Sequence, residues 1–160
     1  MVGAQQLSLS QGGPGPTEAN KAFIRRHLGE QMRRETLDEA VGNFAEDATN
    51  HGRRVGREGI RRTFAALFTA FPDMHFTIHE VVAEGDHVVC QVTMEGTHLG
   101  DPATPIPVPG GLLRGVAPTG RRVAVPNVHI FRIAGGKIAE HAAVRDDLGM
   151  MQQLGLVPTP

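Results

Sequence analysis

The chain contains no tryptophan and no tyrosine, and its only aromatic residues besides histidine are seven phenylalanines. It has a single cysteine, Cys90, which cannot form an internal disulfide, and this composition fits a reducing, cytoplasmic compartment. The apolar context of Cys90 is typical of a core residue. Sixteen basic and seventeen acidic side chains give a formal net charge of −1. Without surplus positive charge or a stacking platform, we expect no nucleic-acid partner.

Long apolar runs are also absent. No segment approaches the roughly 18 apolar residues of a membrane span, and the first eleven residues lack the charge and the apolar block of a signal peptide. We therefore expect no membrane partner and a cytoplasmic location. The phosphate-binding, dinucleotide-binding, zinc-protease and nucleophile-elbow motifs are missing as well. Nucleophilic catalysis by serine or cysteine consequently has no support.

The chain is long enough for one core and too short for two. Residues 1–16 are crowded with glycine, proline and serine, which predicts a disordered tail ahead of a single domain over 17–160. Thr17 is the expected N-cap of a first helix. Apolar residues then recur at helical spacing in three segments, 19–32, 37–44 and 60–71. Pro72 predicts the end of the third helix.

After Pro72 the hydrophobic period changes from about 3.6 to 2. This change predicts strands over 75–82, 87–98, 121–133 and 137–146, followed by a last helical turn over 148–154. Helices that precede an antiparallel sheet predict an α+β fold. We expect the N-terminal helices to pack in the concave face of a curved antiparallel or mixed sheet, a cone-like α+β barrel that could leave an apolar pocket.

Eight histidines are many for this length, so a metal site is the first hypothesis to test. His75 and His79 share one face of a predicted strand, but strand geometry places them roughly 13 Å apart, which is too far for one ion. We therefore expect no metal and no cofactor.

The C-terminal hairpin carries the most chemistry. Val123, Val125, Asn127, His129, Phe131 and Ile133 share one face of their strand, so an imidazole stands in an apolar row beside a carboxamide. A two-residue loop at Gly135 and Gly136 would place Ala142 opposite His129. A three-residue loop with a bulge would instead turn His141 and Ala143 to that face, and the sequence leaves both open.

These segments together resemble one known family, the SnoaL-like polyketide cyclases. The resemblance runs in order over about residues 18–157. It rests on Asn50-His51-Gly52, Pro72-Asp73-Met74, Glu84-Gly85-Asp86-His87-Val88, Gly96-Thr97-His98, Pro118-Thr119-Gly120-Arg121, His129-Ile130-Phe131-Arg132, Gly136-Lys137-Ile138-Ala139-Glu140-His141 and Arg145-Asp146-Asp147-Leu148-Gly149-Met150. The resemblance implies the α+β cone shared with nuclear transport factor 2 and scytalone dehydratase. It also implies an intramolecular aldol condensation without metal or cofactor.

The family's site residues carry over by position. The family histidine corresponds to His129, and the family aspartate, which closes a Glu-His-Trp-Asp pattern, corresponds to Ala143, since this chain reads Glu140-His141-Ala142-Ala143. Asp146 is then the candidate substitute base, with His129 moving protons and His141 orienting the substrate. Asp146 and Asp147 could equally be helix-capping residues. The candidate substrate-binding residues are Asn50, His51, Phe64, Phe68, Asn127, Phe131 and Arg145, although Asn50 and His51 could also form only a local turn.

We expect a cofactor-independent enzyme that cyclises an aromatic, polyketide-like small molecule with several carbonyl groups. The alternatives are a cofactor-independent hydroxylase of the same substrate class, which the absent aspartate favours, and a non-catalytic binding module. Residues 99–117, rich in proline and glycine, are either a lid or a disordered loop. The outer sheet face predicts a homodimer.

Overall fold

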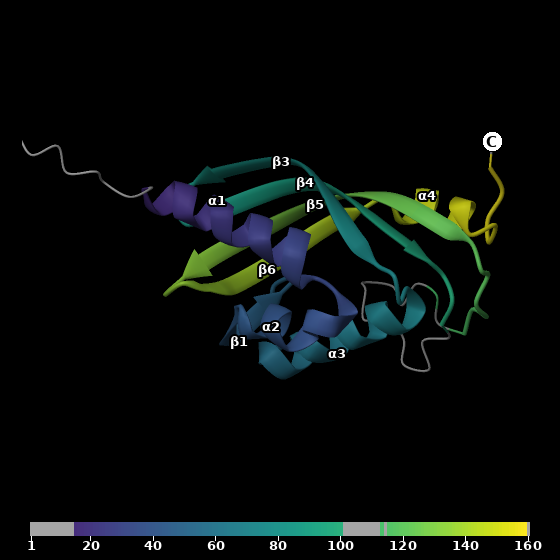
Figure 1. Cartoon of the computed structure of the whole chain (residues 1–160), viewed down its shortest axis with the longest axis horizontal. Coiled ribbons are helices and arrows are strands. Elements are labelled where there is room, and N and C mark those ends of the chain that lie inside the picture. The colour runs from purple at the N-terminus through teal and green to yellow at the C-terminus, as the bar shows by residue number, and fades with distance from the viewer. Residues whose placement is uncertain (1–14, 101–112, 114, 160) are drawn as a thin grey trace, which may run out of the picture.

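The computed structural model describes residues 15–100, 113 and 115–159. In chain order the elements are α1 (Pro16–Arg26), a π-helical turn (His27–Gln31), a 3-10 turn (Arg34–Thr36), α2 (Leu37–Gly42), β1 (Phe44–Asn50), β2 (Arg53–Arg54), α3 (Gly56–Ala70), β3 (His75–Glu84), β4 (His87–Thr97), β5 (Arg122–Ala134), β6 (Lys137–Arg145) and α4 (Asp147–Gln153). Figure 1 shows the long strands β3 to β6 as a curved sheet, with α1 drawn across these strands and α2 and α3 lying below them. The predicted α+β fold class is confirmed.

The six strands form one mixed sheet in the order β2-β1-β6-β5-β4-β3. Strand β1 runs parallel to β6, whereas the other neighbours are antiparallel. The sequence predicted four strands and extended the second helix to Phe44, which was wrong because Phe44 begins β1. Only Phe44 and Ala48 of β1 are buried, so its short, mostly acidic and polar sequence gives no clear alternation.

The start of α1 also differs from the expectation. Gly15 is the N-cap, Pro16 occupies the first helical turn, and no side chain caps this end, so Thr17 is not the cap. Proline suits this position because its missing N–H would have no partner there. Pro16, the last residue of the expected tail, therefore lies in α1, while residues 1–14 lie outside the described residues. So do 101–112 and 114, which make up most of the loop predicted to be a lid or disordered.

The β5–β6 hairpin combines features of both expected registers. Ala134 pairs with Lys137 across the two glycines, as in a two-residue loop, but the register shifts between Arg132 and Ile133. Ile133 pairs with Ile138 and Arg132 with Glu140, so Ala139 is the extra residue of a β-bulge. The bulge turns His141 and Ala143 to the inner face, and Ala143 lies directly opposite His129.

The core lies between this inner sheet face and the helices. Along β5, buried and exposed residues alternate strictly up to Phe131, and Val123, Val125, Asn127, His129, Phe131 and Ile133 are the buried set, as predicted. Cys90 is fully buried, as expected. None of the helices in the described part of the chain has the length and hydropathy needed to cross a bilayer.

Candidate active site

A cavity of about 300 Å³ opens between the inner face of the sheet and the helices. Its wall is mainly apolar, with a few polar groups from β1, β5 and β6, which is the usual character of a small-molecule site. It is lined by His27, Leu28, Met32, Phe44, Asn50, His51, Ile60, Thr63, Phe64, Leu67, Phe76, Met94, Asn127, His129, Phe131, His141, Ala143, Val144, Arg145 and Asp147.

Most of the predicted site residues meet in this cavity. Of the predicted substrate-binding residues, all but Phe68 line it; Phe68 is buried in the core instead. His129 and His141 line it as well, because the bulge in β6 brings both onto the inner face.

Asp146 is not brought together with them. Its carboxylate accepts a hydrogen bond of 2.8 Å from the Gly149 amide and caps α4, which is the capping alternative. Asp147 is the carboxylate that lines the cavity. It is already paired, since Arg145 donates to its Oδ1 from Nε and Nη2 at 3.0 Å each.

Three polar side chains form a relay along the cavity wall. His129 Nδ1 lies 2.9 Å from His141 Nε2, and His141 Nδ1 lies 3.0 Å from Asn50 Oδ1. An amide oxygen only accepts, so His141 donates from Nδ1 and accepts at Nε2. His129 therefore donates from Nδ1, which leaves Nε2 as a lone pair. In the described residues this buried Nε2 has no hydrogen-bond partner.

The imidazoles of the relay are held neutral. Burial, reinforced by the nearby His27, Arg145 and His51, lowers the pKa of His129 to about 3. Burial likewise lowers the pKa of His141 well below its usual value, with further contributions from His129 and His51. The pKa of His51 is lowered by its partial burial and by Arg145. At neutral pH His129 therefore carries an unprotonated, buried Nε2 on a ring that lines the cavity.

The sequence analysis missed several cavity residues, of which His27 has the most chemistry. Its ring is 1% exposed and packs against Phe44 and Phe131. Burial, and secondarily the nearby His141, lowers its pKa to about 3. The available signal was its position four residues after Phe23 on the apolar stripe of the first helix.

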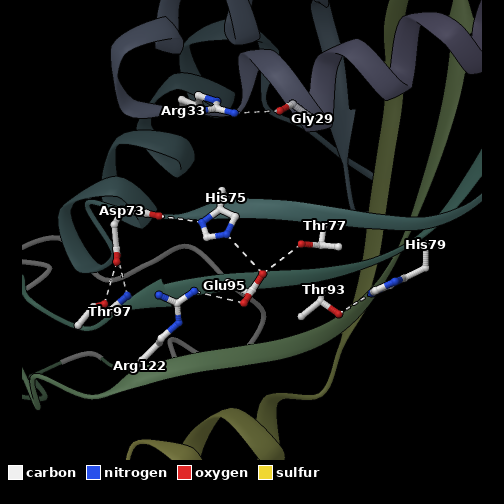
Figure 2. A network of polar contacts seen from close by, with 10 residues as sticks. All are labelled: Gly29, Arg33, Asp73, His75, Thr77, His79, Thr93, Glu95, Thr97 and Arg122. Carbon is white, nitrogen blue, oxygen red and sulfur yellow. Dashed lines mark hydrogen bonds and ion pairs between the residues drawn. The ribbon is translucent and has the colours of Figure 1, made fainter.

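A second polar network lies away from the cavity, across β3, β4 and β5 (Figure 2). His75 Nε2 lies 3.3 Å from a Glu95 carboxylate oxygen, and His79 Nε2 lies 2.7 Å from the Thr93 hydroxyl. The two histidines thus have separate partners. Within the described ranges, no three histidine, cysteine, aspartate or glutamate side chains are arranged to hold a metal ion.

Asp73 anchors one end of the same network (Figure 2). Its carboxylate accepts from the Thr97 amide at 2.6 Å and from the Thr97 hydroxyl at 2.8 Å. Burial alone would raise the pKa of Asp73, but these hydrogen bonds outweigh it and the pKa is lowered. The Pro72-Asp73-Met74 segment therefore ties the end of α3 to β4, a role in the scaffold rather than in the cavity.

A cone of helices and curved sheet that encloses an apolar chamber with a few inward polar groups defines a small-molecule-binding α+β protein. The chain belongs to the SnoaL-like polyketide cyclase family, which matches it over residues 22–154.

Relatives support this assignment. The chain is 33% identical over 107 residues to aklanonic acid methyl ester cyclase DnrD from Streptomyces peucetius, a match that covers 66% of each chain, slightly less than two thirds of the relative. A protein from Jannaschia sp. CCS1, described as a SnoaL-like polyketide cyclase, superimposes with a TM-score of 0.73 at 25% identity, over 92% of this chain and 99% of that one. AclR from Streptomyces galilaeus, described as a candidate hydroxylase, gives 0.71 at 24% identity over 89% of each chain, a likeness of fold alone.

Proposed function

We propose that this protein is a cofactor-independent cytoplasmic enzyme that cyclises a polyketide-like substrate by an intramolecular aldol reaction. The observation that carries the proposal is the unpartnered Nε2 of His129, a buried nitrogen of a ring that lines an apolar cavity and is hydrogen-bonded through Nδ1 to His141 and onward to Asn50. Membership of the SnoaL-like family and the likeness to a cyclase that acts on aklanonic acid methyl ester favour the same reaction.

In the proposed reaction His129 replaces the carboxylate that is absent at Ala143. Its Nε2 takes a proton from a carbon flanked by two carbonyl groups, which leaves an enolate beside an imidazolium. The enolate carbon attacks a second carbonyl carbon of the same molecule, a carbon–carbon bond forms, and the new alkoxide takes the proton back from Nε2. The product is an isomer of the substrate.

A neutral base with a low pKa can do this because charges form as a pair. Burial opposes a lone imidazolium, but an imidazolium created against an enolate offsets much of that cost. The Nδ1–H bond to His141 also spreads the positive charge away from the enolate, toward Asn50 Oδ1. Asn127, whose buried Oδ1 is a second acceptor unpartnered among the described residues, also lines the cavity and is a candidate contact for a substrate hydroxyl.

The reaction is tested by incubating the purified protein with aklanonic acid methyl ester, the compound named for the relative, with and without dioxygen. We expect a cyclised product with the same mass as the substrate, formed equally well without dioxygen. A product that gains one oxygen atom and requires dioxygen would contradict cyclisation and support the hydroxylase alternative. Tight binding without conversion would support the non-catalytic binding module.

We further propose that the protein is a homodimer that pairs through the outer face of the sheet. Val82, Val128, Ile130 and Val144 are exposed there, and Val128 and Val144 are direct cross-strand neighbours. An uncharged apolar patch is complementary to its own two-fold copy.

Replacing both Val128 and Val144 with glutamate should therefore convert a dimer to a monomer, as measured by sedimentation at micromolar concentration. Leu156→Glu, a change at an exposed apolar residue after α4, is the matched control and should leave the dimer intact. A wild-type protein that sediments as a monomer would refute the dimer.

A further inference from the structure

His27 lies at the junction where α1 widens into a π-helical turn. The Met32 amide bonds to the His27 carbonyl at 2.9 Å across five residues, and His27, Leu28 and Met32 all line the cavity. Single π turns inside helices occur frequently at functional sites. Here the wider turn carries a buried imidazole to the side of the cavity formed by the first helix.

One nitrogen of His27 is committed to the scaffold. The Asn43 amide nitrogen lies 2.9 Å from His27 Nδ1 and 2.8 Å from Gln31 Oε1. Because Gln31 Oε1 accepts, Asn43 presents its NH₂ group to both partners, and His27 Nδ1 accepts the second hydrogen. The proton of this neutral imidazole is thereby fixed on Nε2, for which the described residues provide no hydrogen-bond partner.

The polarity of His27 is therefore opposite to that of His129. His27 offers an N–H donor at Nε2, whereas His129 offers a lone pair at the same ring position. Both rings pack against Phe131, with centroid distances of 6.1 Å and 5.9 Å. Asn43 and Gln31 fix one tautomer and Asn50 with His141 fix the other, so the two imidazoles share one cavity without exchanging roles.

We propose that His27 is a substrate-contacting residue whose Nε2–H donates a hydrogen bond to a carbonyl oxygen of the bound molecule. The ligand class is then a ketone with an acidic C–H group: His129 faces the C–H bond, and His27 holds the oxygen on which enolate charge develops. The assignment of a reacting ketone rests on the proposed function, whereas the donor role of His27 can be tested by binding alone.

The test uses two bicyclic probes of nearly equal shape, 1-tetralone and tetralin, which differ in the carbonyl group. Calorimetric titration of the wild-type protein should give about 10-fold tighter binding of the ketone, the worth of one hydrogen bond in a buried site. A ketone that binds no more tightly than tetralin would overturn the proposal. Long-range ¹H–¹⁵N spectra of the free protein should show His27 protonated on Nε2, and a proton on Nδ1 would also overturn it.

Two variants distinguish the contribution of the N–H donor to binding from that of the aromatic ring. His27→Phe keeps an aromatic ring and removes the donor, so the preference for the ketone should vanish while tetralin binds within about two-fold of the wild type. His27→Gln retains an N–H donor and should keep part of the preference. If His27→Phe weakens both probes equally, the ring is only part of the scaffold and the proposal fails.

A third variant acts through the tautomer. Asn43→Leu removes the donor to Nδ1 without adding a charge, so the proton of the neutral His27 ring is no longer fixed on Nε2. The preference for 1-tetralone should then weaken, and an undiminished preference together with an unmoved Nε2 proton would contradict the proposed control by Asn43. If the cyclisation assay fails but the binding preference for the ketone still depends on His27, the proposed reaction is refuted and the donor role of His27 is retained.

Discussion

The substitution His129→Gln is expected to lower kcat for cyclisation by roughly 10² to 10⁴-fold, the usual loss when a positioned acid–base group is removed. Glutamine can fill the space and keep a hydrogen bond toward His141, but its amide cannot accept a proton in place of Nε2. The loss should fall mainly on kcat, because apolar walls such as Phe64 and Phe131 continue to bind the substrate. Steady-state kinetics with aklanonic acid methyl ester measures the two constants separately.

The acid side of the pH profile adds a second criterion. Because the pKa of His129 in the free enzyme is about 3, its ring stays neutral from pH 8 to pH 6. Protonation of this base should therefore cause no fall in kcat/KM over that range. His79→Gln, a change at an exposed imidazole bonded to Thr93, is the matched control and should retain wild-type rates. If Asp146→Asn lost as much activity as His129→Gln, the sequence-based assignment of Asp146 as the base would be favoured instead.

The fold could be predicted because its signals are local and redundant. The alternation along β5 and the stripe on α3 each specify a face over many residues, so small errors at the ends do not change the architecture. The missed strand β1 shows the limit of this reasoning. Its extended conformation is stabilised by parallel pairing with β6, a strand far away in the sequence. Such a tertiary contact leaves no local pattern in the residues of β1.

The membership of the site was predicted better than its chemistry. Position on β5 and β6 was enough to nominate His129, His141 and Arg145, but a single bulge residue, Ala139, decides which residues of β6 face inward. The same limit applies to Asp146 and Asp147. Adjacent carboxylates at a helix start are equivalent in sequence, and only the backbone turn places the first on Gly149 and the second against Arg145.

His27 was missed for a different reason. A histidine on an apolar helical stripe usually satisfies both nitrogens within the core, so no feature of the sequence marks His27 as a site residue. What distinguishes it is the Asn43 amide, 16 residues away, which donates to His27 Nδ1 and also to Gln31 Oε1, and which leaves His27 Nε2 unbonded within the described part of the chain. Such asymmetry is a property of the assembled hydrogen bonds and has no counterpart in hydrophobic periodicity.

Acid should unfold this protein at a pH where most small domains are still stable. His27 and His129 have pKa values of about 3 in the folded state, against about 6.5 when exposed, so between those values the unfolded chain binds protons that the folded chain does not. Stability is therefore complete above pH 6.5 and falls as the pH is lowered. At pH 5 the expected loss is about 2 kcal/mol for each histidine, a large fraction of the roughly 5–15 kcal/mol of a typical domain.

Urea denaturation at pH 7.5, 6.5, 5.5 and 5.0 measures this loss, and the difference between variants assigns it to particular rings. In His129→Gln the drop in unfolding free energy between pH 7.5 and 5 should shrink by about 2 kcal/mol, whatever the absolute stability of the variant, because one buried proton-binding group no longer differs between the two states. The control Leu156→Gln changes an exposed side chain that carries no titratable group and should leave the drop unchanged. Equal pH dependence in all three proteins would mean that the buried rings already carry protons in the folded state, and then His129 could not present the lone pair that the proposed reaction requires.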